Sequence, residues 1–352
     1  MKEVKIGILG AGYVANTFHM PAFQEIEGVK IVAIYSHRKE IADSFSRTWK
    51  IPKIFHGEEG ISKLSADPEV ELVDIALPTN LHLTATRAAA ENHKNVICEK
   101  PLARNQYEAR EMLDVVRKYG VQHFYAENQV FMPQVKRAEA LIERQSFGDI
   151  FWLRCRQAHL SQHSGWFWDP KSAGGGAMLD LGSHSIEIAQ RLLRKTPVSV
   201  FGWASKFTRT MQTDDNSLIL VKYDGAQLLQ AENTWITRGG LDIHIEVHGA
   251  NGSLYLTNTR EAGISMFYVD DSTKQTGTYE TIGEATQTKK ARLFPKMDEH
   301  QTLGFVDEFR HFLLSITIGE RAIETYEEGY KVNQLIDAAY ESSNTGKWIQ
   351  LP

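Results

Sequence analysis

The sequence has few cysteines and no long hydrophobic run, and both absences narrow the kind of protein that it encodes. Cys98 and Cys155 are the only cysteines among 352 residues, which is too few for the disulfide framework of a small secreted protein. No stretch reaches the ~20 apolar residues that a membrane-spanning helix needs. The apolar run at residues 6–12 follows two lysines, as in a signal peptide, but it is short, rich in glycine and lacks a clear cleavage site. We therefore expect a cytoplasmic protein.

An excess of positive charge is missing as well. Lysine and arginine number 39 against 44 aspartates and glutamates, so the formal net charge is -5. Proteins that bind nucleic acids or anionic membranes carry a basic patch or stripe, so we expect neither partner. A length of 352 residues allows two domains of ordinary size, each with a core of its own.

A glycine-rich turn follows the first predicted strand. Residues 4–9 are mostly apolar, residues 10–15 read Gly-Ala-Gly-Tyr-Val-Ala, and a helical pattern then runs to Phe23. The first glycine permits a tight turn, the second lets the backbone approach a pyrophosphate, and the small closing alanine lets the helix pack on the sheet. This order predicts a dinucleotide site. Its predicted contacts are Gly10, Gly12, Tyr13, Val14 and Ala15.

The second predicted strand, at residues 30–35, ends in Ser36, His37 and Arg38. An NAD-selective site usually carries an acidic residue here for the ribose 2′-hydroxyl, and this sequence has none. A serine hydroxyl and an arginine suit a 2′-phosphate instead, which slightly favours NADP over NAD. The alternative is that Arg38 only begins a solvated helix.

Predicted strands continue to alternate with predicted helices up to residue 126. Strands at residues 72–77, 96–99 and 121–126 are separated by helices at residues 82–92 and 106–119. This alternation is typical of a doubly wound parallel sheet, the Rossmann architecture of the α/β class. The residues that follow the strand at 72–77 either contact the cofactor or only form a turn and cap a helix. These candidate contacts are Pro78, Thr79, Asn80 and His82.

A charged tripeptide, Glu99-Lys100-Pro101, ends the strand at residues 96–99 abruptly. Because a proline disfavours helical geometry in the residue before it, Lys100 should be extended. Its amine would then point into the crevice beyond the carboxyl ends of the strands, where open α/β sheets bind their ligands. Taken alone, the tripeptide is explained at least as well as a charged connection between a strand and a loop that has no chemical role.

After residue 126 strands predominate. We expect strands at residues 150–158, 198–207, 217–223, 227–235, 243–248 and 253–257, with turns at Gly225 and Asn251-Gly252 that suit antiparallel neighbours. Helices at residues 304–316 and 326–342 close the chain. The sequence thus predicts a Rossmann domain at residues 1–126 and an α+β domain with a large open, mostly antiparallel sheet at residues 127–352, whose last helices pack back toward the first domain. The uncovered face of that sheet suggests a homodimer or homotetramer.

One helix of the second domain carries a candidate acid/base pair. Asp180 and His184 are four residues apart and share a helix face. A carboxylate in that position can fix the tautomer of an imidazole and raise its basicity for proton transfer. The alternative is a solvated face, because Glu187 and Arg191 continue the same spacing.

The loop at residues 159–169 is rich in aromatic and imidazole side chains, namely His159, His163, Trp166, Phe167 and Trp168. Flat aromatic faces pack on the apolar faces of pyranose rings, so this loop predicts a sugar-binding wall. Phe167 fits a core position better. His244 and His248 alternate on a predicted strand, which favours a polar strand face over a metal site.

Taken together, three of these motifs resemble the Gfo/Idh/MocA family of oxidoreductases. They are the glycine turn at residues 10–15, Cys98-Glu99-Lys100-Pro101, and residues 175–184, which read Gly-Gly-Ala-Met-Leu-Asp-Leu-Gly-Ser-His. The resemblance covers nearly the whole chain. It implies a nicotinamide cofactor, hydride transfer at a carbinol carbon of a sugar, an inositol or a related polyol, and a cis peptide bond before Pro101.

The resemblance also implies roles for single residues. Lys100 would hydrogen-bond the reacting oxygen, His184 would accept or donate the proton, and Asp180 would position substrate and histidine. Glu99 would reach the nicotinamide ribose, and Lys100 would also touch the cofactor. The predicted substrate contacts are Lys100, Asn128, His159, His163, Trp166, Trp168, Asp180 and His184, and no metal is expected. After Asn128 this chain has Gln129 and Val130, where the family often has an aromatic residue and an arginine.

The resemblance leaves two other functions open. Some relatives of this fold are glycoside hydrolases that keep NAD tightly bound and cleave their substrate through transient oxidation and elimination, which is the main alternative. A cofactor-sensing regulator without catalysis is a third, and the intact set of Lys100, Asp180 and His184 argues against it.

Overall fold

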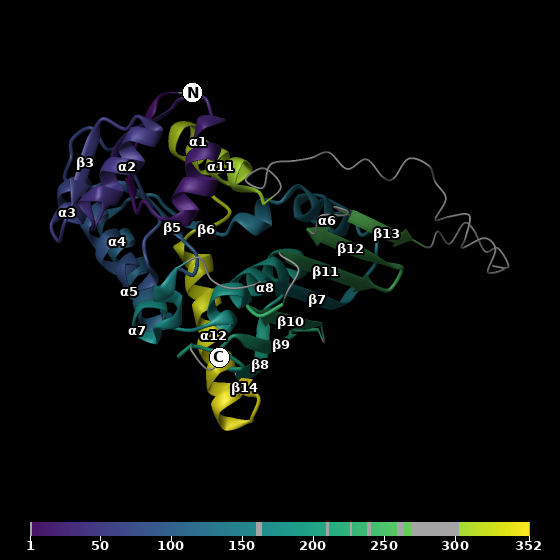
Figure 1. Ribbon diagram of the computed structural model, residues 1–352. Coiled ribbons are helices and arrows are strands. Elements are labelled where there is room, and N and C mark those ends of the chain that lie inside the picture. Colours follow the sequence, from purple (N-terminus) through teal and green to yellow (C-terminus); the bar gives the residue numbers. More distant parts are fainter. Residues whose placement is uncertain are drawn as a thin grey trace.

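Two β-sheets organise the chain (Figure 1). The computed structural model describes residues 2–159, 164–208, 211–225, 227–237, 241–258, 264–268 and 303–351, with only the backbone for residues 264–268. No helix within these ranges is long and apolar enough to cross a membrane.

The first sheet is the parallel sheet that the sequence predicts, so the fold class is confirmed. Its strands are β1 (Val4–Leu9), β2 (Val29–Ser36), β3 (Lys53–His56), β4 (Leu72–Ile75), β5 (Asn95–Glu99) and β6 (His123–Ala126), in the order β3-β2-β1-β4-β5-β6. All five strand pairs are parallel. The order reverses between β1 and β4, and this reversal creates the crevice in which such sheets bind ligands. Strand β3 was not predicted, because it is a four-residue edge strand without a buried side chain.

Alternating side chains of these strands pack into two apolar layers, one on each face. Ile6 and Ile8 belong to one layer, whereas Val73 and Val96 belong to the other. The elements between the strands are η1 (Ala15–His19), α1 (Met20–Gln24), α2 (Lys39–Trp49), α3 (Gly60–Ser65), η2 (Thr79–Leu81), α4 (His82–Glu91) and α5 (Gln106–Tyr119).

Helix α5 shows why these segments are helical. The side chain of Asn105 accepts hydrogen bonds from two backbone N–H groups of the first turn, and Gly120 ends the helix in the left-handed region. Its buried residues Ala109, Met112, Leu113 and Val116 recur at three- and four-residue spacing, which places them on the face toward the sheet.

The second sheet contains eight strands in the described ranges, in the order β13-β12-β11-β7-β10-β9-β8-β14. The strands are β7 (Ile150–Ala158), β8 (Pro197–Ser205), β9 (Asn216–Tyr223), β10 (Leu228–Thr234), β11 (Asp242–Gly249), β12 (Gly252–Asn258), β13 (Ile264–Tyr268) and β14 (Ile349–Gln350). Only β7 and β10 pair in parallel, so the mostly antiparallel sheet is confirmed. The prediction omitted β13 and β14.

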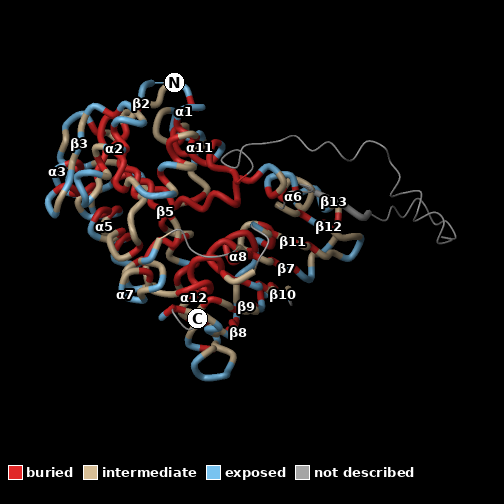
Figure 2. The backbone as a smooth tube through the Cα atoms, viewed as in Figure 1, coloured by how far each residue is buried: buried red, intermediate tan, exposed pale blue. Residues whose placement is uncertain are grey.

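Helix α8 (Ala177–Leu193) covers one face of this sheet and packs on β7, β9 and β10. Nearly all of its residues are buried, as Figure 2 shows. The shorter elements around it are η3 (Asn128–Phe131), α6 (Pro133–Glu143), η4 (Gly165–Trp168) and α7 (Pro170–Ala173).

The last two helices connect the two sheets. Helix α11 (Phe305–Ile318) packs against α1, where Phe309 stacks on Phe23 with ring centroids 4.3 Å apart. Helix α12 (Tyr326–Thr345) packs against α5 and β6 on one side and against α8 and β8 on the other. The domain boundary predicted at residue 126 coincides with the end of β6 and stays a prediction.

Alanine substitutions at the two glycines of this turn should differ in their effect on the stability of the fold. Gly10 has a φ of 117°, and a Cβ there would lie 2.2 Å from the carbonyl oxygen of Ala76, so Gly10→Ala should destabilise the fold by about 2 kcal/mol. A Cβ at Gly12 would meet no atom within 4 Å. Gly12→Ala is therefore the matched control and should unfold at the wild-type temperature. Thermal denaturation followed by circular dichroism measures both variants, and equal midpoints would contradict this account of the turn.

Candidate active site

A buried ion pair joins the two halves of the molecule. Lys100 follows β5, and its Nζ donates to the Oδ1 of Asp180 on α8 at 2.8 Å and to the backbone carbonyl of Asp180 at 3.2 Å. The Lys100–Pro101 peptide bond is cis, as the family resemblance implies. The two side chains that were predicted from distant motifs are thus in direct contact.

The electrostatics of this pair fix both charges at neutral pH. Burial alone would lower the pKa of Lys100, but Asp180 first, and then Glu99 and Glu127, raise it above its usual value. Burial alone would raise the pKa of Asp180, but Lys100, His159 and His184 lower it to about 2. Lys100 is therefore an ammonium group that can donate hydrogen bonds, and it is not available as a general base.

The partner of His184 differs from the prediction. Its Nδ1 lies 2.5 Å from the Oε1 of Glu127, which follows β6 and is completely buried. Asp180 does not take this role, because its Oδ1 binds Lys100 and its Oδ2 accepts from the indole Nε1 of Trp235 at 3.1 Å. The expectation that Asp180 orients His184 is thus corrected: Glu127 fixes the tautomer, and Asp180 holds Lys100.

The alternative of a solvated face on α8 is wrong. Asp180, His184 and Glu187 are all buried, with 3–7% of each residue exposed. Arg191 is only partly exposed and pairs with Glu139 of α6. Tertiary packing of α8 between the sheet and α12 buries the face that the sequence alone leaves ambiguous.

The predicted aromatic wall is built in part around Trp235. This buried indole lies edge-to-face with Phe167, and Phe167 stacks on Trp166 with ring centroids 3.8 Å apart. Trp168 is 37% exposed. Phe167 belongs to the edge of a small apolar cluster, as expected. Through Trp235, the wall reaches the carboxylate of Asp180.

The remaining predicted substrate contacts are His159, Asn128 and His163. His159 follows β7, and its charge acts on Asp180, so it lies near the ion pair. Asn128 is buried, and its side-chain amide donates to the carbonyl of Leu303 at 2.7 Å. His163 lies outside the described residues.

The glycine turn fits a dinucleotide. The Gly10 N–H donates to the carbonyl of Tyr35 at 2.9 Å, which places the turn at the carboxyl end of β1 beside the end of β2. The open space next to Gly12 leaves the backbone accessible to a pyrophosphate. Tyr13 is exposed, Val14 is half-buried, and Ala15, the first residue of η1, is buried.

The other predicted cofactor contacts surround the same crevice. Ser36 ends β2 and is half-buried, while His37 and Arg38 are exposed. Pro78, Thr79 and Asn80 form the turn after β4, with Thr79 buried. His82 is buried as well, and its two ring nitrogens lie 2.9 Å from the carbonyl of Leu77 and 3.1 Å from that of Leu102.

Two family models match the chain, and together they cover more than half of it. Residues 4–127 match an oxidoreductase family with an NAD-binding Rossmann fold, and residues 135–255 match the Gfo/Idh/MocA C-terminal domain. The chain belongs to the Gfo/Idh/MocA family of oxidoreductases. The family resemblance predicted from the three motifs is thereby confirmed.

Named relatives in this family include sugar dehydrogenases. Levoglucosan dehydrogenase of Pseudarthrobacter phenanthrenivorans is 24% identical over 100% of this chain and 99% of its own length. D-xylose 1-dehydrogenase (NADP(+)) 2 of Haloferax volcanii is 26% identical over 98% of this chain and 99% of its own.

Solved structures of the family share the fold. Levoglucosan dehydrogenase in complex with NADH has a TM-score of 0.83 at 23% identity and covers 100% of both chains. GenD2 from gentamicin A biosynthesis in complex with NAD has a TM-score of 0.86 at 20% identity and covers 100% of this chain and 97% of its own.

Sequence reasoning missed a buried histidine of this Gfo/Idh/MocA chain. His19 donates from Nδ1 to Asp74 at 2.8 Å and from Nε2 to Glu99 at 2.8 Å. Burial alone would lower the pKa of His19, but Asp74 and Glu99 raise it to about 10. His19 is therefore a charged imidazolium that hydrogen-bonds two carboxyl groups at once.

This arrangement corrects the expected position of Glu99. Its Oε1 binds His19, and its Oε2 accepts from the backbone N–H of Lys100 at 3.0 Å. Glu99 thus faces the interior and braces the backbone of Lys100, instead of pointing toward a ribose. Within the described ranges, no group of three or more His, Cys, Asp and Glu residues is placed to hold a metal ion.

A second carboxylic acid, Glu308 of α11, is buried near His19 and Glu99. Neither of its carboxyl oxygens has a hydrogen-bond partner among the described residues, and the residue is fully buried. Burial first, and then the charges of Glu99, Glu127 and Asp74, raise the pKa of Glu308 well above its usual value, against the opposing charge of His19. Its surroundings therefore favour the protonated, neutral form of Glu308.

Replacing Glu308 by glutamine should change how stability depends on pH. A carboxyl whose pKa is raised by folding binds its proton more tightly in the folded state, so its contribution to the free energy of unfolding is lost as pH rises from the usual glutamate value toward the raised one. The loss amounts to roughly 1 kcal/mol for each pH unit in that window. The stability of Glu308→Gln relative to wild type should therefore increase from pH 5 to pH 8.

Chemical denaturation at several pH values measures this difference. Asp307→Asn is the matched control, because it makes the same change from acid to amide at an exposed position of the same helix. A constant difference between Glu308→Gln and wild type across pH would contradict the neutral, buried state of Glu308.

Proposed function

We propose that this protein is an NAD(P)-dependent dehydrogenase or reductase that acts on a carbinol or ketone carbon of a sugar, an inositol or a sugar derivative. The observation that carries the proposal is the contact between Lys100, which follows β5, and Asp180 of α8, together with the pairing of His184 on the same helix with Glu127. The names of the relatives, levoglucosan dehydrogenase and D-xylose dehydrogenase, support a sugar substrate.

The residues of these two pairs have distinct roles in the proposed reaction. When bound, the nicotinamide accepts or supplies the hydride. The ammonium group of Lys100 donates a hydrogen bond to the reacting oxygen and stabilises its negative charge. Asp180 holds that ammonium group in place. His184 uses Nδ1 for Glu127, which leaves Nε2 to take the hydroxyl proton in oxidation or to return it in reduction.

Substrate recognition falls to the remaining residues of the second domain. Trp166 and Trp168 would pack on the faces of a pyranose ring. His159 and His163 would donate to its hydroxyl groups, and Asn128 would contribute its side-chain carbonyl, since its amide is engaged.

The cofactor would be held by the glycine turn and the turns after β2, β4 and β5. The proposed contacts are Gly10, Gly12, Tyr13, Val14, Ala15, Ser36, His37, Arg38, Pro78, Thr79, Asn80, His82 and Lys100, whereas Glu99 supports Lys100 from the interior. We slightly favour NADP, because Ser36 and the exposed Arg38 stand where an acidic residue would select NAD.

The assembly we propose is a homodimer or homotetramer through the second sheet. Trp152, Trp203 and Tyr255 are large apolar side chains on its strands that are 36–48% exposed, which is unfavourable unless another surface covers them. The two cysteines are buried and unpaired, which suits the reducing cytoplasm that we propose as its location.

A substrate panel tests the proposed function. Sugars, inositols and glycosides are offered with NAD and with NADP, and both reduced cofactor and released aglycone are followed. Reduced cofactor in proportion to substrate supports the dehydrogenase. Aglycone release without net cofactor reduction would instead favour the NAD-dependent glycoside hydrolase.

Lys100→Met and His184→Asn should abolish turnover without loss of cofactor binding. Each variant removes one group that acts on the reacting oxygen, so kcat should fall roughly 100-fold or more. Quenching of protein fluorescence by the reduced cofactor reports binding separately. Lys118→Met, on the exposed side of α5, is the control for the lost lysine charge. Wild-type kcat in both site variants would refute the assignment.

Arg38→Ala should reduce the preference for NADP. Loss of the guanidinium removes a charge-assisted hydrogen bond to a 2′-phosphate, so KM for NADP should rise about tenfold while KM for NAD changes little. The control is Lys39→Ala, which removes the same charge from the next exposed position. An unchanged ratio of the two KM values would show that Arg38 does not read the 2′-phosphate.

A further inference from the structure

Trp235 contacts both the Lys100–Asp180 ion pair and the aromatic loop at residues 165–168. It directly follows β10 and is completely buried. Its indole N–H donates to Oδ2 of Asp180 at 3.1 Å, while Lys100 donates to Oδ1 of the same carboxylate at 2.8 Å. The ring of Phe167 lies edge-to-face with the indole, with ring centroids 6.1 Å apart. One rigid side chain therefore connects the ion pair with the aromatic loop.

A short segment between β8 and β9, residues 212–215, anchors the aromatic loop. The hydroxyl of Thr213 donates to the backbone carbonyl of Phe167 at 3.1 Å. The backbone N–H of Gln212 donates to the carbonyl of Trp168 at 3.3 Å. Two consecutive residues of the loop are thus bound to two consecutive residues of this segment.

The same segment also holds Trp235 and the first turn of α8. The carbonyl of Asp215 accepts from the backbone N–H of Trp235 at 2.9 Å. The carboxylate of Asp214 accepts from the N–H groups of Gly176 at 2.9 Å and Met178 at 2.8 Å. A glycine at the N-cap of α8 has no side chain to fill this role, so Asp214 caps the helix from outside. The loop, the indole and the turn that carries the ion-paired aspartate therefore share one support.

The indole N–H restricts the orientation of the Asp180 carboxylate. The terminal torsion of an aspartate side chain has a broad energy minimum, so the carboxylate turns easily unless both of its oxygens are held. Lys100 holds one oxygen and Trp235 holds the other. Without the indole N–H the carboxylate could rotate, and the ammonium group of Lys100 would move with it. Displacements of this kind are costly, because catalysis depends on close alignment with the reacting atom.

We propose that Trp235 is a positioning residue that couples the contact between a sugar ring and the aromatic loop to the placement of Lys100. The inference rests on the proposed dehydrogenase function and deepens it, because it names cyclic sugars as the substrates that use this coupling. A ring packed on Trp166 restricts Phe167, which stacks on Trp166 with ring centroids 3.8 Å apart, and Phe167 in turn contacts the indole. Contact far from the reacting carbon thus raises kcat in addition to affinity.

Trp235→Phe tests the position of the indole N–H. The substitution removes the donor to Asp180 and keeps an aromatic ring at the end of β10. We expect kcat with the best cyclic substrate of the panel to fall roughly tenfold, while KM for the cofactor changes little. Steady-state kinetics measures both constants.

Trp166→Ala, alone and combined with Trp235→Phe, tests the coupling. In the wild-type background, Trp166→Ala should lower kcat about fivefold in addition to raising KM for the sugar, because ring contact no longer orders the indole. In the Trp235→Phe background the further fall in kcat should be less than about twofold, because the coupling is already broken. A purely structural role of Trp235 predicts independent effects, which multiply.

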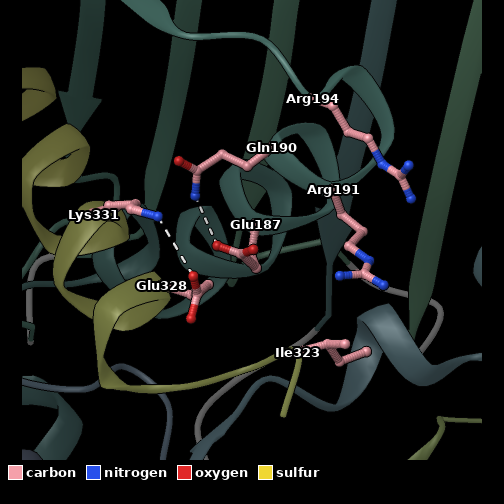
Figure 3. A pocket seen from close by; sticks show the side chains of 7 residues that line it. All are labelled: Glu187, Gln190, Arg191, Arg194, Ile323, Glu328 and Lys331. Atoms are coloured by element: carbon pink, nitrogen blue, oxygen red, sulfur yellow. Dashed lines mark hydrogen bonds and ion pairs between the residues drawn. The ribbon is translucent and has the colours of Figure 1, made fainter. Parts of the chain in front are cut away.

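Gln190→Met is the matched control for the loss of a hydrogen bond made on α8. Gln190 donates to Glu187 at 2.7 Å beside a surface pocket of about 190 Å³, near the carboxyl-terminal end of the helix (Figure 3). This variant should keep the wild-type kcat. Thr213→Val, which removes the hydroxyl that binds the carbonyl of Phe167, replaces Trp235→Phe if thermal denaturation shows that Trp235→Phe does not fold. It should show the same non-additivity with Trp166→Ala.

The outcomes separate the coupling from the function on which it rests. A combined effect on kcat that is smaller than the product of the two separate effects supports the coupling. Wild-type kcat in folded Trp235→Phe, or effects that multiply, overturns the coupling and leaves the proposed function standing. A wild type that reduces neither cofactor with any substrate of the panel overturns the proposed function and the coupling together.

Discussion

The ion pair between Lys100 and Asp180 is the interaction on which the rest of the site depends. It joins the exit of β5 to the first turn of α8, so one contact aligns the first sheet with the helix that covers the second. Burying two charges is costly unless each finds good partners. Asp180 satisfies its other oxygen with the indole of Trp235, while the backbone N–H of Lys100 binds Glu99. These additional bonds offset the desolvation of the pair and hold the ammonium group in one place.

Several carboxyl groups are buried around this pair, and the structure stabilises them in two ways. Next to Lys100, the imidazolium of His19 hydrogen-bonds Asp74 and Glu99 at once and partly offsets their charge. Elsewhere in the interior, burial raises the pKa values of Glu187, Glu308 and Glu324, because their charged forms are poorly solvated. His19 thus holds Glu99 where it supports the backbone of Lys100, whereas burial favours the protonated forms of the other three acids.

Much of the fold followed from patterns along the chain. The alternation of apolar strands and helices up to residue 126 predicted the parallel sheet, and the turns in the second half predicted a mostly antiparallel one. The edge strand β3 and the terminal strand β14 were missed, because each is very short and neither has a buried side chain. Glu127 was missed too, although it follows a parallel strand at its carboxyl end just as Lys100 follows β5. That shared position is the signal that would have identified it.

The sequence by itself determined the family, the class of fold and the three motifs that meet at the site. It could do so because glycine, proline and apolar spacing act on the local backbone. Only the tertiary structure decided which carboxylate pairs with which basic side chain. Asp180 and His184 share a helix face, but the carboxylate that reaches His184 comes from residue 127, and the cation that reaches Asp180 comes from residue 100. Partner choice depends on how α8 packs between the second sheet and α12, and spacing along one helix contains no information about that packing.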